Sequence, residues 1–314
     1  MAYRIEDGES VRDAVRCCSR EELDKAIHRL TKEIEDDPVE SVHGARKSLK
    51  KQRSLLRLSR TAMRPDQRRA EAAVFRDAAR RLSATREAEV MTKVLDDVSE
   101  HFSDTDSQLA YAAAHEYLVT RRDRERERAD RSGAVAAVAV ELQAARRRVE
   151  DWELRDRGWK ALAGGLERSY RRGRHAFKLA RAEPTPQNLH DWRKRAKDLW
   201  YHLRFLRPLS AATMRGQADQ AHRLSDLLGD DHDLWVLREA LTSMAGEIPA
   251  DLEPLVAAVD HRRTELQRDA LLLGERVYAE RPKAFLRRLR RYWKAWRAET
   301  PRGRASARAV STSG

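Results

Sequence analysis

The chain has 314 residues, with 64 Lys or Arg and 51 Asp or Glu, which gives a formal net charge of +13 at pH 7. No apolar run approaches the roughly 20 residues that a membrane-spanning helix needs, and the N-terminal stretch MAYRIEDGES has no apolar signal core. The two cysteines, Cys17 and Cys18, are adjacent, which excludes a disulfide framework. We therefore expect a cytoplasmic protein with no membrane partner and with enough residues for a buried core.

Helices are expected throughout, because Leu, Ala, Arg and Glu dominate the sequence and no stretch alternates as a strand would. In the first half the expected helices span residues 10–36, 37–60, 65–82, 108–130 and 134–152. In the second half they span residues 166–182, 185–207, 211–228, 234–244, 249–274 and 281–297. The last residues, 299–314, are rich in Arg, Ser, Ala and Gly, and we expect a disordered basic tail there.

Local signals mark several of these helix ends. Ser10 can cap the first helix, and Asp37-Pro38 and Thr185-Pro186 each combine a capping side chain with a proline in the first turn. Gly229 is expected to stop the helix that begins near residue 211. The aspartates of Asp230–Asp233 would then cap the helix that follows.

The most informative feature is a repeat with an offset of 147 residues. The stretch VHGARKSLKKQRSLLRL at 42–58 matches LHDWRKRAKDLWYHLRF at 189–205. The matched pairs are His43 with His190, Arg46 with Arg193, Lys47 with Lys194, Lys50 with Lys197, Leu56 with Leu203 and Arg57 with Arg204. A repeat of this length indicates two copies of one unit, here assigned to residues 1–154 and 155–298. The predicted architecture is all-α, with two antiparallel helical bundles related by an approximate two-fold.

On a helix, the polar residues of the first copy fall on one arc of about 80° beside the apolar arc rather than opposite it. That arc contains no acid, so its cations repel each other unless an anion or a wet cavity faces them. One such helix from each copy would form a basic groove. The simpler alternative is a solvated surface on which Lys and Arg stems cover apolar groups.

The positive charge is concentrated in three segments. Residues 41–60, 189–207 and 281–314 carry net charges of +7, +4 and +10, so the remaining residues together are −8. This distribution predicts a polyanionic partner. A nucleic acid is one candidate, bound by the basic surface and the tail.

The same region of the sequence also contains residues that occur in metal sites and in catalytic sites. The spacing of Asp230, Asp231, His232 and Asp233 fits no usual metal site, and we expect no metal or other cofactor. His43 or His190 could act as a nucleophile or general acid. However, no glycine-rich phosphate loop, paired carboxylates or magnesium-binding acids accompany them. We therefore expect a binding protein rather than an enzyme.

The duplicated pattern His-x-x-Arg-x-x-x-Lys-x-x-Arg on a helix resembles the CHAD domain family. The first copy matches it fully, whereas Trp200 stands where the second copy should have Arg, followed by the aromatic Tyr201. The segment Leu228–Leu234 is similar to the family's LG-x-x-x-D-L element, Arg86-Glu87 looks like a degenerate counterpart of it, and a Tyr and Arg cluster precedes the second motif. The resemblance covers residues 10–297. No Glu-x-Glu-x-Lys strand of a CYTH domain is present.

This resemblance implies two four-helix-bundle halves around a basic central channel that binds inorganic polyphosphate, with polyphosphate granules as a possible location. Histidines that protonate near pH 6 would strengthen binding. The residues expected to bind the anion are His43, Arg46, Lys50, Arg53, Arg57, Arg86, Arg171, Arg174, Lys178, His190, Arg193, Lys197, Tyr201 and Arg204.

Overall fold

The computed structural model describes residues 3–82, 84–99, 105–131, 133–248 and 250–299. These residues form helices joined by short turns, and strand-type pairing among them is limited to an isolated bridge between Met63 and Leu154. The helices are α1 (Val11–His28), α2 (Pro38–Leu58), α3 (Pro65–Arg81), α4 (Ala84–Ser99), α5 (Thr105–Arg131), α6 (Ala134–Arg148), α7 (Gly158–Ala182), α8 (Pro186–Phe205), α9 (Ala211–Met244), α10 (Glu253–Val277) and α11 (Pro282–Glu299). The predicted all-α class is confirmed. No helix in this part of the chain is long and apolar enough to cross a membrane.

The capping residues start the helices as predicted. The side chains of Ser10, Asp37 and Thr185 each accept a hydrogen bond from the backbone N–H three residues later. These bonds satisfy donors that a helix N-terminus otherwise leaves unpaired. The two motif helices, α2 and α8, therefore begin within one residue of equivalent positions of the repeat.

Gly229 does not stop a helix, which corrects the prediction. α9 runs unbroken from Ala211 to Met244, so the aspartates after Gly229 lie inside the helix and cap nothing. A Cβ at Gly229 would lie 3.2 Å from the Arg193 guanidinium, so the glycine allows α8 to approach α9 closely. Leu224, Leu228, Leu234 and Leu237 are all buried along the helix, and this packing overrides the weak local tendency of glycine to end it.

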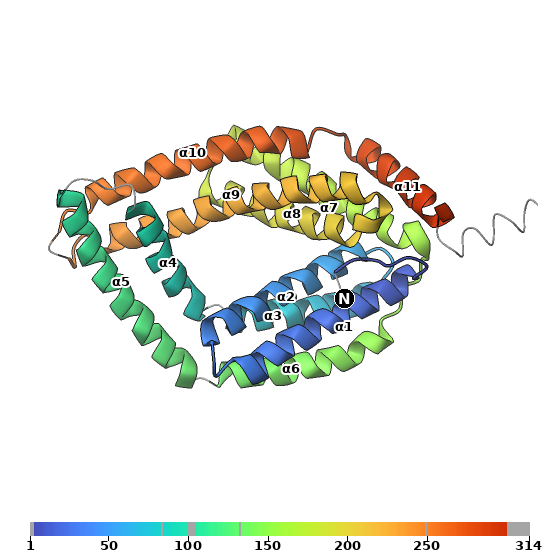
Figure 1. The fold of residues 1–314 in the computed structure, drawn as a ribbon, viewed down its shortest axis with the longest axis horizontal. Coiled ribbons are helices and arrows are strands. Elements are labelled where there is room, and N and C mark those ends of the chain that lie inside the picture. The colour runs from blue at the N-terminus through green and yellow to red at the C-terminus, as the bar shows by residue number, and fades with distance from the viewer. Residues whose placement is uncertain (1–2, 83, 100–104, 132, 249, 300–314) are drawn as a thin grey trace, which may run out of the picture.

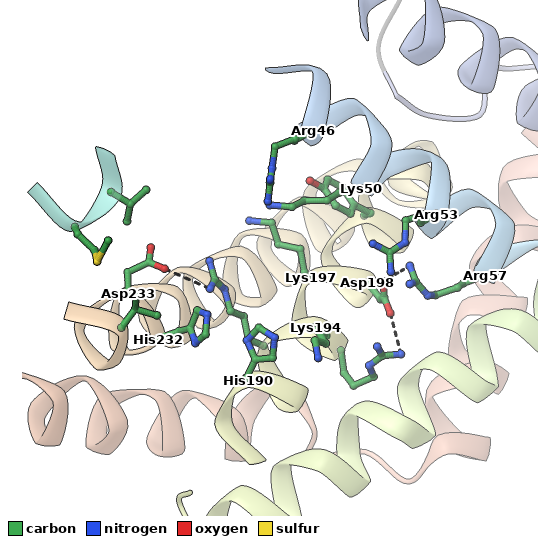
Figure 2. Close-up of a pocket in the computed structure, with 16 residues that line it drawn as sticks. Arg46, Lys50, Arg53, Arg57, His190, Lys194, Lys197, Asp198, His232 and Asp233 are labelled. Carbon is green, nitrogen blue, oxygen red and sulfur yellow. Dashed lines mark hydrogen bonds and ion pairs between the residues drawn. The ribbon is translucent and has the colours of Figure 1, made fainter. Parts of the chain in front are cut away.

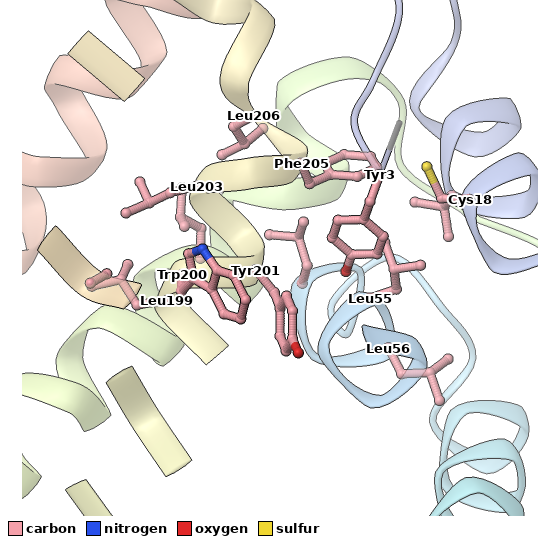
Figure 3. Packing of buried hydrophobic residues seen from close by; sticks show 14 of the residues in the cluster. Tyr3, Cys18, Leu55, Leu56, Leu199, Trp200, Tyr201, Leu203, Phe205 and Leu206 are labelled. Carbon is pink, nitrogen blue, oxygen red and sulfur yellow. The ribbon is translucent and has the colours of Figure 1, made fainter. Parts of the chain in front are cut away.

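The main hydrophobic core joins the two motif helices. Tyr3, from the N-terminal segment, packs its ring edge-on against Tyr201 and Phe205 of α8 at centroid distances of 6.0 and 6.2 Å (Figure 3). Its hydroxyl donates to the Lys51 carbonyl of α2 over 3.2 Å. The His202 ring lies 3.1 Å from the Ser54 carbonyl, which connects the two helices directly. The cationic face of each motif helix therefore lies beside the buried contact between α2 and α8.

A second core lies at the other end of the molecule. The α4–α5 hairpin packs there against α9 and α10 (Figure 1), burying Met91, Leu95, Leu118, Leu237 and Leu255. Helices from the first copy therefore pack on helices from the second. The domain limits at 154 and 155 stay a prediction, but the packing crosses them.

Candidate functional site

The basic faces of α2 and α8 line one cavity of about 450 Å³ (Figure 2). Residues of α9 and of α4 complete its wall. The lining residues are Arg46, Lys50, Arg53, Arg57, Val90, Met91, His190, Arg193, Lys194, Arg195, Lys197, Asp198, Tyr201, His232, Asp233 and Val236. Eight of them are Lys or Arg and two are Asp, so the wall is strongly positive.

On the α2 side, four cations follow one face of the helix. Arg46, Lys50, Arg53 and Arg57 are spaced by four, three and four residues, which places them on one stripe. Arg46 also donates from Nη1 to the Leu82 carbonyl over 2.8 Å, which ties α2 to the end of α3. Arg46 therefore has a structural contact as well as a place in the cavity.

On the α8 side, the cations lie next to aromatic rings and carboxylates. Lys197 Nζ lies 4.7 Å from the centroid of Trp200 and 3.8 Å from an oxygen of Asp226. Arg193 lies 3.7 Å from Asp233 of α9. Trp200, which replaces the arginine expected at this position, is buried and supports Lys197 by a cation–π contact.

Two histidines face each other in the cavity wall. The ring centroids of His190 and His232 are 4.4 Å apart. Burial, the His232 ring and the cations Lys194 and Arg193 lower the pKa of His190 to about 4. The pKa of His232 is also about 4, because of burial and the same cations. In the free protein His190 is therefore neutral at pH 6, so the expected protonation near that pH requires a bound anion that raises its pKa.

Asp198 lines the cavity although it was not among the site residues predicted from the sequence. It is buried, and its Oδ1 lies 3.0 Å from Arg57 while its Oδ2 lies 3.2 Å from Arg195. The α2 stripe contains no acid of its own, but α8 brings one against it. Asp198 in the second copy corresponds to Lys51 in the first copy. This change from a base to an acid is the feature of the sequence that could have identified Asp198.

The acidic residues that follow Gly229 lie on two different faces of α9. Asp233 and His232 face the cavity, whereas Asp231 is buried against α10, where it accepts hydrogen bonds from Gln267 over 2.7 Å and Arg263 over 3.2 Å. Sequence reasoning missed His232 and Asp233 as lining residues because it placed them in a cap. Among the described residues, no group of three or more His, Cys, Asp or Glu could hold a metal ion.

Five predicted residues whose side chains the structure describes do not line the cavity. His43 is half-buried on α2, Arg171 and Lys178 are exposed on α7, and Arg204 lies over Trp200 at 5.2 Å. Arg174 donates to the Glu280 carbonyl, which links α7 to the turn before α11. The side chain of Arg86 lies outside the described residues. Any part these six play in binding stays a prediction.

A family model for the CHAD domain matches residues 20–242, well over half of the chain. The chain belongs to the CHAD family. Among solved structures it is similar to PptA from Streptomyces chartreusis, with a TM-score of 0.58 and 13% sequence identity over 86% of this chain and 98% of that chain. At this identity the similarity shows the fold alone. No curated protein matches the sequence.

Every residue that lines the cavity falls inside the CHAD match, from Arg46 to Val236. The match ends within α9, so α10 and α11 lie beyond it. The cavity is thus built by the part of the chain that defines the family.

Proposed function

We propose that this CHAD protein binds inorganic polyphosphate in the cavity between α2 and α8. The observation that carries the proposal is the convergence of cations from both copies of the motif on one cavity, with only two carboxylates in its wall. The family resemblance of the motif implies polyphosphate as the anion. The cavity alone favours any slender polyanion.

Several groups in the wall can bind phosphate oxygens. Arginines can donate two parallel hydrogen bonds to a phosphate, and lysines act as point charges. The Tyr201 hydroxyl and His190 Nδ1 are buried and have no hydrogen-bond partner among the described residues. Both belong to residues of the cavity wall. An unsatisfied buried polar group is unfavourable, so a ligand oxygen that satisfies these groups would stabilise the complex.

The width of the site should select against a nucleic-acid duplex. Linear polyphosphate is a single chain that can enter between two helices, whereas a duplex carries its phosphates on the outside of a wide cylinder. We propose that the protein binds polyphosphate without turnover. We also propose that it is located where polyphosphate accumulates, including polyphosphate granules. Release of phosphate by the protein with added divalent metal ions would contradict the non-catalytic part of this proposal.

A competition titration tests the ligand. Labelled long-chain polyphosphate is displaced by unlabelled polyphosphate or by duplex DNA of equal phosphate content, near physiological salt. We expect polyphosphate to compete far better. Equal competition by DNA would mean that the charge acts as an open surface, and would favour nucleic-acid binding instead.

A charge-matched pair of variants tests the site. Arg53→Ala with Arg193→Ala removes one cavity cation from each motif helix. Lys47→Ala with Arg290→Ala removes the same charge from exposed positions outside the cavity. Charge-assisted hydrogen bonds contribute about 1.5–3 kcal/mol each, so the first pair should weaken binding by at least about tenfold relative to the second. Equal losses in the two pairs would contradict the proposed site.

A further inference from the structure

A second basic cleft lies next to the first cavity, between α2, α3, α7 and α8. Its volume is about 250 Å³, the space of roughly eight water molecules. The lining residues are Arg53, Leu56, Arg57, Arg60, Arg68, Ala72, Arg76, Arg168, Ser169, Arg172 and Arg195. Eight of these eleven are arginines, and the lining includes no carboxylate in the described part of the chain.

Most of this charge has no ion-pair partner among the residues that the structure describes. Within the described residues, Arg57 and Arg195 pair with Asp198, and Arg76 pairs with Asp77 on its own helix. The other five make no ion pair with a residue in the described part of the chain, and they are Arg53, Arg60, Arg68, Arg168 and Arg172.

Guanidinium groups gathered in this way repel each other. Burial and neighbouring arginines lower the pKa of Arg53, Arg60 and Arg68, which shows that the surroundings disfavour their charged forms. Such an arrangement opposes folding and is relieved when an anion occupies the cleft.

The two spaces share three residues. Arg53, Arg57 and Arg195 line both the cavity and the cleft, so the two are neighbours across these side chains. Asp198 lies at this junction, 6% exposed, with one oxygen toward Arg57 (Figure 2). Its other oxygen lies toward Arg195. A carboxylate that bridges two arginines occupies the place that a phosphate group would take between them.

We propose that the arginine cleft is a second phosphate subsite that continues the first cavity, and that Asp198 is an internal anion which a phosphate group of a long chain displaces from Arg57 and Arg195. This inference rests on the proposed function. A single phosphate group gains little by replacing a carboxylate of equal charge. A chain that is already held in the cavity gains the further arginines of the cleft once it passes the junction. The arrangement thus favours chains long enough to fill both spaces.

The test compares tripolyphosphate with a chain of about one hundred phosphates on charge-matched variants, by titration at one salt concentration. Arg68→Ala with Arg168→Ala removes two arginines that line only the cleft. Arg69→Ala with Arg290→Ala removes the same charge from exposed positions that line neither space. We expect the first pair to weaken long-chain binding about tenfold relative to the second, with tripolyphosphate affinity equal in both. Equal long-chain affinities in the two pairs would overturn the second subsite.

Asp198→Asn tests the internal anion. It removes the competing charge with little change of shape, so the affinity for the long chain should rise several-fold. A weaker affinity would show that the carboxylate only positions the two arginines, and would overturn its displacement. The arginine pairs do not depend on this variant folding, and thermal unfolding of each protein checks that all retain structure.

The outcomes separate this inference from the proposed function. If Arg53→Ala with Arg193→Ala weakens binding but the cleft variant does not, only the second subsite fails. If neither has an effect beyond that of its control, the proposed function fails as well.

Discussion

Polyphosphate affinity should depend on pH through His190 and His232, whose rings face each other in the cavity. Both have a pKa of about 4 in the free protein, so about 1% of each ring is protonated at pH 6. A bound phosphate brings negative charge beside the rings and raises the pKa of each. Binding is then coupled to proton uptake, and the affinity rises as the pH falls.

The size of the effect follows from the two pKa values. If a bound chain restores a ring to the ordinary pKa of about 6.5, linkage predicts about a fourfold gain in affinity from pH 8 to 6 for each histidine. A further gain of about sevenfold follows from pH 6 to 5. The curve is therefore shallow at neutral pH and steep below pH 6. Asp191 partly offsets the lowering of the His190 pKa, whereas Lys194 and Arg193 contribute to that lowering.

The assay is a titration with long-chain polyphosphate at constant ionic strength from pH 8 to 5. His190→Gln should reduce the rise below pH 6. His261→Gln, which removes an exposed histidine of α10 outside the cavity, should leave the rise unchanged. Side-chain NMR of the free protein should place the His190 pKa near 4. A steep change between pH 8 and 7 that disappears in His190→Gln would refute the reasoning, since it would require a protonated ring at neutral pH. A flat curve down to pH 5 would show that the anion does not reach the histidines.

Three further predictions concern salt and stability. With about six phosphates neutralised at −0.7 each, log K should fall against log salt with a slope near −4, and a measured slope near −1 would indicate far fewer contacts. Gly165→Ala would place a Cβ 1.9 Å from the Leu58 carbonyl oxygen, so denaturant unfolding should show a loss of about 1–3 kcal/mol, whereas unchanged stability would contradict the close approach of α7 to α2. Burial lowers the pKa of His202 to about 4, below the unfolded value of about 6.5, so its contribution to stability is lost as the pH falls from 6.5 toward 4. In His202→Leu, which inserts the residue type found at the repeat-equivalent Leu55, the difference in unfolding free energy between pH 7 and 5 should shrink by about 1–2 kcal/mol, and an unchanged difference would show that another group titrates.

Local patterns explain why much of the site could be predicted. Helix starts depend on neighbouring residues such as Asp37 and Pro38, and the stripe of cations on α2 follows from the helix period alone. The repeat then indicated that α8 carries a matching stripe. Arg53 and Arg193, which these patterns predicted as site residues, both line the cavity.

The arginine cleft could not be found in the same way. Arg60, Arg68, Arg168 and Arg172 come from the end of α2, from α3 and from α7, and each by itself looks like an ordinary surface residue. They share no sequence period, because periodicity describes one helix at a time. Their meeting depends on how three helices cross, which includes the close approach of α7 to α2 at Gly165.

By itself, the sequence determined the helical class, the capped starts of α1, α2 and α8, and the two cationic faces, because capping and periodicity act over a few neighbouring residues. Only the tertiary structure decided that α9 continues through Gly229, that Asp198 lies against Arg57, and that His190 is neutral near pH 6. In each case the deciding neighbour comes from another helix. Burial and charge interactions depend on distance in space, so they are defined only once the helices have packed.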